Sequence, residues 1–253
     1  MLDLAAAYLP RLPDHGFFSH LTAAAIWGLP LPPSLDTRLH VSYPHRVRSV
    51  RTTGVVGHHL VIRPDEITEV HGLPVTTSER TWADLATHVG FEDLVAAGDR
   101  VLWRRDPLST MDAVADLARR HPGRRGRPQR LAALVHLCDR SDSPPETKLR
   151  VRIILAGLPR PSVNEDVWDH GTFVGRPDLS FPDYRELVEY EGDGHRTDRE
   201  QWMRDVARVP RFEGVGWHTH RATALDLRDG SRDLIARVAG SLRTKGWSGA
   251  RGL

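Results

Sequence analysis

The sequence predicts an α+β protein in which mixed β-sheets are flanked by helices. Short strand-like segments alternate with amphipathic helical segments along the chain. A β-hairpin is expected over residues 175–192, where turn residues separate two partly apolar stretches. The 253 residues are long for one domain and comfortable for two. We expect an N-terminal module over 1–122, a basic linker and helix over 123–140, and a C-terminal domain over 141–253.

The elements of the N-terminal module follow from capping residues and periodicity. Ser19 is expected to cap a short helix that Gly28 ends. Residues 37–43 and 55–62 alternate like strands. Helical periodicity then returns in three segments, 75–86, 91–103 and 109–120.

Two arginine-rich stretches are the candidate nucleic-acid contacts. Both are rich in turn residues, and they contain Arg46, Arg48, Arg51, Arg124, Arg125 and Arg127. Such arginines suit the phosphate backbone, so DNA is the expected partner. An exposed basic loop and a solvated hinge are the alternatives. Base readout is not assigned, because no predicted helix carries the Arg, Asn and Gln pattern of a recognition helix.

The C-terminal domain is expected to run helix, three strands, helix, strand and closing helix. Ser143 and Glu146 form a capping box, with Pro144 at the first helical position. The later elements are strands near 162–168, 173–181 and 185–191, a helix from Asp198 through Arg211, a strand over 216–221 and a helix over 231–243. This order, αβββαβ, favours a mixed sheet with helices on its faces.

Three acidic residues of the predicted hairpin are expected to share one face of the sheet. A two-residue turn at 183–184, Asp183 and Tyr184, places Asp178 directly opposite Glu189. Glu191 lies two residues further along and points to that face too. Two carboxylates this close repel each other unless a proton or a cation lies between them, and Mg²⁺ suits oxygen ligands. The alternative is a solvent-facing hairpin with an ordinary cross-strand ion pair between Arg176 and Glu191.

A series of short motifs runs in order through residues 143–229. They are SPPETKL from Ser143, GLP from Gly157, RPDLSFP from Arg176, VEYEG from Val188, then His195 and Gly216-Trp217. In this order and spacing they resemble the PD-(D/E)XK nuclease superfamily. The closer likeness is to its very-short-patch-repair (Vsr-like) endonuclease branch, whose members share a restriction-endonuclease-like core.

The resemblance implies a DNA endonuclease that depends on Mg²⁺ or Mn²⁺ and acts in DNA repair or phage defence. Asp178, Glu189 and the carbonyl of Tyr190 are the implied ligands of the ion. The other implied catalytic residues are His195 for proton movement, Glu146 for positioning, Arg176 for the developing charge, and Glu191. Capping alone remains the alternative for Glu146, and a surface loop remains the alternative for His195.

One position departs from the superfamily pattern. Glu191 stands where the superfamily has a lysine, and Lys148 and Lys245 are the only lysines in the chain. The departure favours an alternative function, a non-catalytic DNA-binding regulator or antitoxin-like protein that keeps the nuclease fold. The retained Asp178 and Glu189 favour the enzyme.

The N-terminal half contains two further motifs. They are Ser19-His20-x-Thr22-Ala-Ala followed by Gly28-Leu-Pro, and GLPVTTSERT from Gly72 followed by Asp84-Leu-Ala. They resemble the AbiEi-type antitoxins of abortive-infection systems, in which a winged-helix-like element precedes a mixed domain. The resemblance implies a DNA-binding or regulatory module, or alternatively a protein partner in a toxin–antitoxin pair.

Composition restricts the remaining function classes. A single cysteine, Cys138, rules out an internal disulfide and suits the cytoplasm. The N-terminus does not resemble a signal peptide, and no apolar run reaches the ~20 residues of a membrane span. Zinc-finger, P-loop and GxSxG motifs are absent. Two histidine pairs, His58-His59 and His218 with His220, are expected to be exposed surface.

Overall fold

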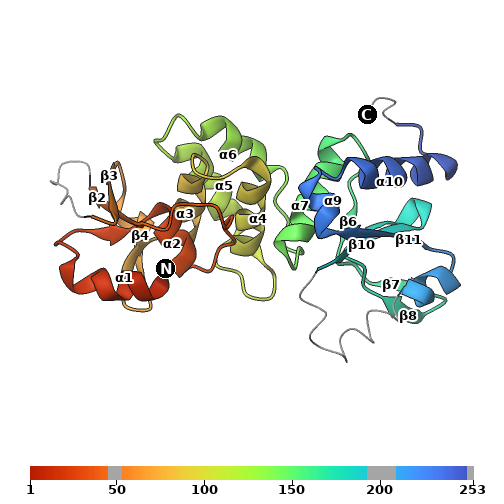
Figure 1. Cartoon of the computed structure of the whole chain (residues 1–253), viewed down its shortest axis with the longest axis horizontal. Helices are drawn as coiled ribbons and strands as arrows, with labels where there is room; N and C mark the ends of the chain where they lie inside the picture. The colour runs from red at the N-terminus through yellow and green to blue at the C-terminus, as the bar shows by residue number, and fades with distance from the viewer. Residues whose placement is uncertain (45–52, 193–208, 250–253) are drawn as a thin grey trace. The chain divides into compact units, whose positions relative to one another are not determined.

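The computed structural model describes residues 1–44, 53–192 and 209–249, and it divides the chain into two compact units (Figure 1). The N-terminal unit is Met1–Asp139, and the C-terminal unit is Arg140–Leu253. The division falls next to residue 141, the expected start of the C-terminal domain. Each unit contains a mixed sheet with helices packed beside it, which confirms the expected α+β class.

The sheet of the N-terminal unit has five strands in the order β3-β2-β1-β5-β4. They are β1 (Phe17–Phe18), β2 (Leu39–Pro44), β3 (Val55–Leu60), β4 (Ile67–Val70) and β5 (Leu73–Thr76). The pairs β2–β3 and β1–β5 are parallel, and the pairs β1–β2 and β4–β5 are antiparallel. Helices α1 (Leu2–Tyr8) and α2 (His20–Ile26) pack against this sheet and share its apolar core.

Helix α2 lies where the sequence predicts it, but the predicted cap is wrong. Gly28 follows the last turn at φ +66°, the left-handed region that favours glycine, as expected for a helix end. Ser19 occupies the N-cap position, yet its hydroxyl makes no capping hydrogen bond. The hydroxyl bonds instead to Nδ1 of His20 and to the hydroxyl of Ser42, because these buried polar groups need partners.

Four further helices lie among the described residues of the N-terminal unit. They are α3 (Ser78–Leu85), α4 (Phe91–Leu102), α5 (Met111–Arg120) and α6 (Arg127–Leu134). Thr77 caps α3 and Thr110 caps α5 through side-chain hydrogen bonds. Helix α6 packs against α4 and α5, so the stretch expected to be a linker is part of this unit up to Asp139. Its Arg130 is buried and donates to the carbonyls of Ala118 and Gly123.

The sheet of the C-terminal unit has the order β11-β10-β9-β6, beside a two-stranded sheet β7-β8. The strands are β6 (Ser162–Val163), β7 (Val167–Asp169), β8 (Thr172–Gly175), β9 (Leu179–Phe181), β10 (Glu186–Glu191) and β11 (His218–Thr223). Strand β10 pairs antiparallel with β9 and parallel with β11. The single strand expected over 173–181 is therefore two strands that belong to different sheets.

Helices and a hairpin cover the two faces of this sheet. The helices are α7 (Pro144–Leu155), α9 (Ala224–Arg228) and α10 (Arg232–Thr244), and α10 packs on β10 and β11. Strands β7 and β8 lie on the opposite side (Figure 1), where Leu187 packs with Val167, Val174 and Phe212. Residues 209–214 are helical, whereas the expected helix start at Asp198 lies outside the described residues. Among the described helices, none is long and apolar enough to cross a membrane.

Candidate functional site

The β9–β10 hairpin has the register that the sequence predicts. Leu179 pairs with Val188, so continuing the antiparallel ladder by one residue brings Asp178 opposite Glu189. The predicted two-residue turn is wrong, however. Residues Pro182–Tyr184 form a 3₁₀ turn, and Arg185 closes it with a left-handed backbone at φ +50°. Proline at the start of the turn favours this longer connection.

The two facing carboxylates differ in exposure. Glu189 is only 3% exposed, whereas Asp178 is half-buried. One oxygen of Asp178, Oδ2, accepts a hydrogen bond of 2.7 Å from the backbone amide of Tyr190. The side chain of Asp178 is therefore held against β10 at the residue that follows Glu189. Directly opposed side chains on neighbouring strands have Cβ atoms roughly 5 Å apart. The geometry brings together the carboxylates of Asp178 and Glu189, which could act as metal ligands, and the backbone of Tyr190.

Glu146 is both a helix cap and a neighbour of this pair. Its Oε1 accepts from the hydroxyl of Ser143 at 2.7 Å, and its Oε2 accepts from the amide of Asp142 at 3.1 Å. Oε2 also accepts from the side-chain amide of Asn164 at 2.8 Å, and the backbone amide of Asn164 donates to the carbonyl of Asp178 at 3.0 Å. Glu146 thus reaches Asp178 through Asn164, which the sequence reasoning missed because nothing local distinguishes this asparagine.

The cations around the hairpin are arranged differently from the expectation. Arg176 bonds to Asp166 at 2.6 Å, and Glu191 pairs with Arg221 at 3.2 Å, so the expected cross-strand pair between Arg176 and Glu191 is not the one formed. The reason is topological, because Arg176 precedes β9 and Arg221 lies on β11. Arg221 is also the register partner of Glu189. A cation that the sequence reasoning did not assign therefore lies beside both glutamates.

The remaining expected site residues are distributed as follows. Arg124, Arg125 and Arg127 are exposed in the N-terminal unit, as phosphate contacts would require. Four other candidates lie outside the described residues: His195, Arg46, Arg48 and Arg51.

The interpretation of His220 as exposed surface is wrong. His220 is buried, and its Nε2 lies 2.8 Å from Oε2 of Glu186, which is fully buried. Glu186 also bonds to Ser241 and pairs with Lys245 at 2.7 Å. Burial raises the pKa of Glu186, but the bonds from Lys245 and Ser241 outweigh it and hold that pKa below its ordinary value. His218 is exposed as expected.

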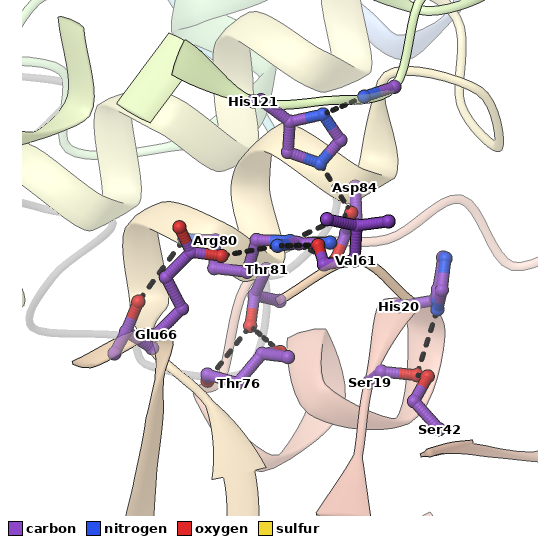
Figure 2. Close-up of polar contacts among 12 residues, drawn as sticks. Ser19, His20, Ser42, Val61, Glu66, Thr76, Arg80, Thr81, Asp84 and His121 are labelled. Atoms are coloured by element: carbon purple, nitrogen blue, oxygen red, sulfur yellow. Dashed lines mark hydrogen bonds and ion pairs between the residues drawn. The ribbon is translucent and has the colours of Figure 1, made fainter. Parts of the chain in front are cut away.

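The second N-terminal motif, which contains Arg80 and Asp84, lies in a buried charge network (Figure 2). Arg80, 1% exposed, pairs with Glu66 and with Asp84, the latter at 3.0 Å. Arg120 also pairs with Glu66. His121 accepts from the Gly123 amide at Nδ1, so its Nε2 is the nitrogen that donates to Asp84, at 2.7 Å.

This network controls the charge of Asp84. Burial raises the pKa of Asp84, but the hydrogen bond from His121 and the charge of Arg80 outweigh it and lower that pKa. Asp84 is therefore a buried carboxylate that stays ionised at neutral pH.

Comparison with known proteins gives relatives but no family. No protein-family model matches the chain. The uncharacterized proteins MT2308 and Rv2248, from two strains of Mycobacterium tuberculosis, are each 26% identical over 218 residues, which cover 86% of this chain and 78% of the relative. The crystal structure of the RV2827C protein from Mycobacterium tuberculosis is similar with a TM-score of 0.33 and 19% identity. That match covers 66% of this chain and 64% of the other.

Proposed function

We propose that the C-terminal unit is a metal-dependent DNA endonuclease of the Vsr-like type and that the N-terminal unit is an AbiEi-like DNA-binding or regulatory module. The observation that carries the proposal is the β9–β10 register, which brings Asp178 opposite a buried Glu189. A buried glutamate beside a second acid is costly to fold and is typical of functional sites. The same register brings the backbone of Tyr190 to Asp178.

The donor set suits a hard divalent cation. Carboxylates and a backbone carbonyl are the ligands that Mg²⁺ and Mn²⁺ prefer, and no thiolate lies in this hairpin. Asp178, Glu189 and Tyr190 are the residues that would hold the ion. When bound, it would lower the pKa of a water molecule and shield the charge of the phosphate.

The neighbouring residues have supporting roles in this proposal. Asn164 and Glu146 fix the backbone of Asp178, and the Tyr190 amide fixes its side chain, so the first acid is preorganised. Arg221, beside Glu189 and paired with Glu191, supplies the positive charge that the superfamily takes from lysine. We assign this role to Arg221 in place of Arg176, because Arg221 is the register partner of Glu189, whereas Arg176 precedes β9 and pairs with Asp166.

Plasmid cleavage tests the proposal directly. Purified protein is incubated with supercoiled plasmid and with short matched and mismatched duplexes, in Mg²⁺, in Mn²⁺ and in EDTA. We expect cleavage with either metal and none with EDTA. Asp178→Asn and Glu189→Gln should each abolish cleavage, while Asp183→Asn, in the exposed turn of the same hairpin, should cut normally. Wild-type cleavage in both site variants would reject the site.

The cation assignment needs its own comparison. Arg221→Gln should lower the cleavage rate at saturating DNA while leaving DNA affinity almost unchanged, because the arginine acts on the developing charge. Arg176→Gln is the matched control and should cut at nearly the wild-type rate. The opposite ranking would return the role to Arg176.

A second function is favoured by one observation. Glu191 occupies the lysine position of the superfamily, and its carboxylate is neutralised by Arg221. A protein with this feature that binds DNA without cutting it would be a regulator that keeps the nuclease fold. Gel-shift and cleavage assays on the same duplexes separate the two, because the regulator binds in every metal condition and yields no product.

A further inference from the structure

We propose that His20, His40 and His58 form a transition-metal site in the N-terminal unit and that its ion is Zn²⁺. The three histidines come from the start of α2, from β2 and from β3. One ring nitrogen of each lies within 4.8 Å of the other two. This site is separate from the carboxylates of the C-terminal unit and does not depend on the nuclease proposal.

The geometry is close to that of a zinc site. Nε2 of His58 lies 3.0 Å from Nδ1 of His40, and the rings of His20 and His58 stack with centroids 4.1 Å apart. Tetrahedral zinc with Zn–N bonds of about 2.0–2.1 Å separates its ligand nitrogens by roughly 3.4 Å. Small side-chain rotations would therefore bring the three nitrogens to ligand distances.

The donor chemistry also suits zinc. Imidazole binds Zn²⁺, Cu²⁺ and Ni²⁺ well, and only its neutral form ligates. Burial lowers the pKa of His20 to about 3 and that of His40 to about 4, and burial lowers the pKa of His58 as well. The three rings are therefore neutral at neutral pH, even though histidine ordinarily titrates near that range.

One ring is not satisfied by the protein alone. Nε2 of His40 is buried and has no hydrogen-bond partner among the described residues. A buried polar atom without a partner is rare, and a bound ion is one of the groups that can satisfy it. Only one hydrogen bond, with His58, is described for the His40 ring.

The surroundings hold His20 as metal sites hold their ligands. Nδ1 of His20 lies 2.8 Å from the hydroxyl of Ser19, which contacts the hydroxyl of Ser42 at 2.5 Å (Figure 2). Such a bond to the second ring nitrogen orients the ring and sets its tautomer. His20 also has φ +48°, a left-handed backbone that is unusual outside glycine and recurs at functional sites.

A fixed negative charge lies near the cluster. The charge of Asp84 acts on both His20 and His58, where it opposes the effect of burial. This carboxylate is held in place by Arg80 and His121. A divalent ion among three neutral ligands brings two positive charges into a buried region, and Asp84 partly compensates them. His88, whose ring centroid is 4.9 Å from that of His20, is the neighbouring side chain for a fourth position.

Metal binding by the full-length protein tests the site. Protein without an affinity tag is stripped with EDTA, dialysed against Zn²⁺ or Co²⁺, and measured by elemental analysis and visible absorption. We expect about one more equivalent of Zn²⁺ in the wild type than in His58→Gln, with an affinity loss of at least ~10-fold in the variant. Co²⁺ should give the intense visible bands of a tetrahedral site in the wild type and lose them in His58→Gln.

Two controls keep the result specific. His59→Gln changes the exposed neighbour on the same strand, and His218→Gln changes the histidine-containing group around Glu186 in the C-terminal unit. Both should keep the wild-type Co²⁺ spectrum. His58 is partly exposed, so its variant should keep the circular dichroism of the wild type, and His40→Gln provides an independent second test. The proposal is overturned if both His58→Gln and His40→Gln keep the Co²⁺ bands of the wild type. It is also overturned if only His218→Gln loses these bands.

Discussion

Replacing Asp178 with asparagine should make the metal-free protein more stable while it removes function. The asparagine side chain would keep an oxygen that accepts the hydrogen bond from the Tyr190 amide, so the hairpin geometry is retained. The substitution removes one of two negative charges that face each other across β9 and β10. A site built to hold a cation carries this repulsion whenever the cation is absent.

The expected size follows from Coulomb's law. Two unit charges about 5 Å apart repel by roughly 3 kcal/mol at an effective dielectric constant of about 20, and by less than about 1 kcal/mol in bulk water. Glu189 is buried and Asp178 is half-buried, so we expect a gain of about 1–3 kcal/mol in EDTA. At about 4 °C per kcal/mol, the melting temperature of this unit should rise by roughly 4–12 °C.

Magnesium should cancel or reverse the stability difference between the two proteins. A site with a Kd of about 0.1 mM gains about 2.7 kcal/mol at about 10 mM Mg²⁺, and a protein without the site gains nothing. Thermal unfolding by calorimetry, in EDTA and across a Mg²⁺ titration, measures both effects. Asp183→Asn controls for the general loss of one acid from the hairpin. The reasoning is refuted if Asp178→Asn matches this control in EDTA and gains as much from Mg²⁺ as the wild type.

Three further predictions concern the Glu146 cap, the buried Arg80 pairs and the exposed arginines. Glu146→Gln should unfold with a free energy within about 1 kcal/mol of the wild type, because glutamine also serves in a capping box, but it should cut DNA poorly. An unchanged cleavage rate would mean that Glu146 is only a cap. Arg80→Ala should lower the free energy of unfolding in denaturant by about 3–5 kcal/mol, because it leaves two buried acids with one partner fewer. Arg63→Ala, at an exposed ion pair, should lower it by less than about 1 kcal/mol. Equal losses in the two variants would contradict a buried network. Replacing the three exposed arginines together by glutamine should reduce the salt dependence of DNA binding by up to about three phosphate contacts, and an unchanged slope would leave Arg124, Arg125 and Arg127 without a role in binding.

The local features of the C-terminal unit could be predicted from the sequence. The β9–β10 register was predicted from an assumed two-residue turn, and the longer observed turn keeps the same pairing, with Leu179 opposite Val188 and so Asp178 opposite Glu189. The turn was less predictable, because two-residue and four-residue connections fit the same register. The cap at Ser143 was also local and is present, with the Ser143 hydroxyl accepting from the Glu146 amide.

The features that depend on distant residues could not be predicted. The histidine cluster joins positions 20, 40 and 58 through three elements, and His58 was therefore interpreted as surface. The acid network joins Glu66 to Arg120 across 54 positions. Nothing within a window of about ten residues signals either arrangement. The packing of the stretch over 123–140 depends on distant residues too: the guanidinium of Arg130 in α6 donates to the carbonyls of Ala118 and Gly123 in the folded unit.

Asp84 interacts with two different parts of the N-terminal unit. The negative charge of Asp84 acts on His20 and His58. Its carboxylate also accepts the hydrogen bond from Nε2 of His121. Nδ1 of His121 accepts from the amide of Gly123, which directly precedes the exposed arginines. A metal ion bound among the histidines and the N–H group of His121 would therefore both interact with the carboxylate of Asp84. Thermodynamic linkage makes such sharing reciprocal. The conformation of the basic stretch and the occupancy of the histidine cluster should accordingly report on each other.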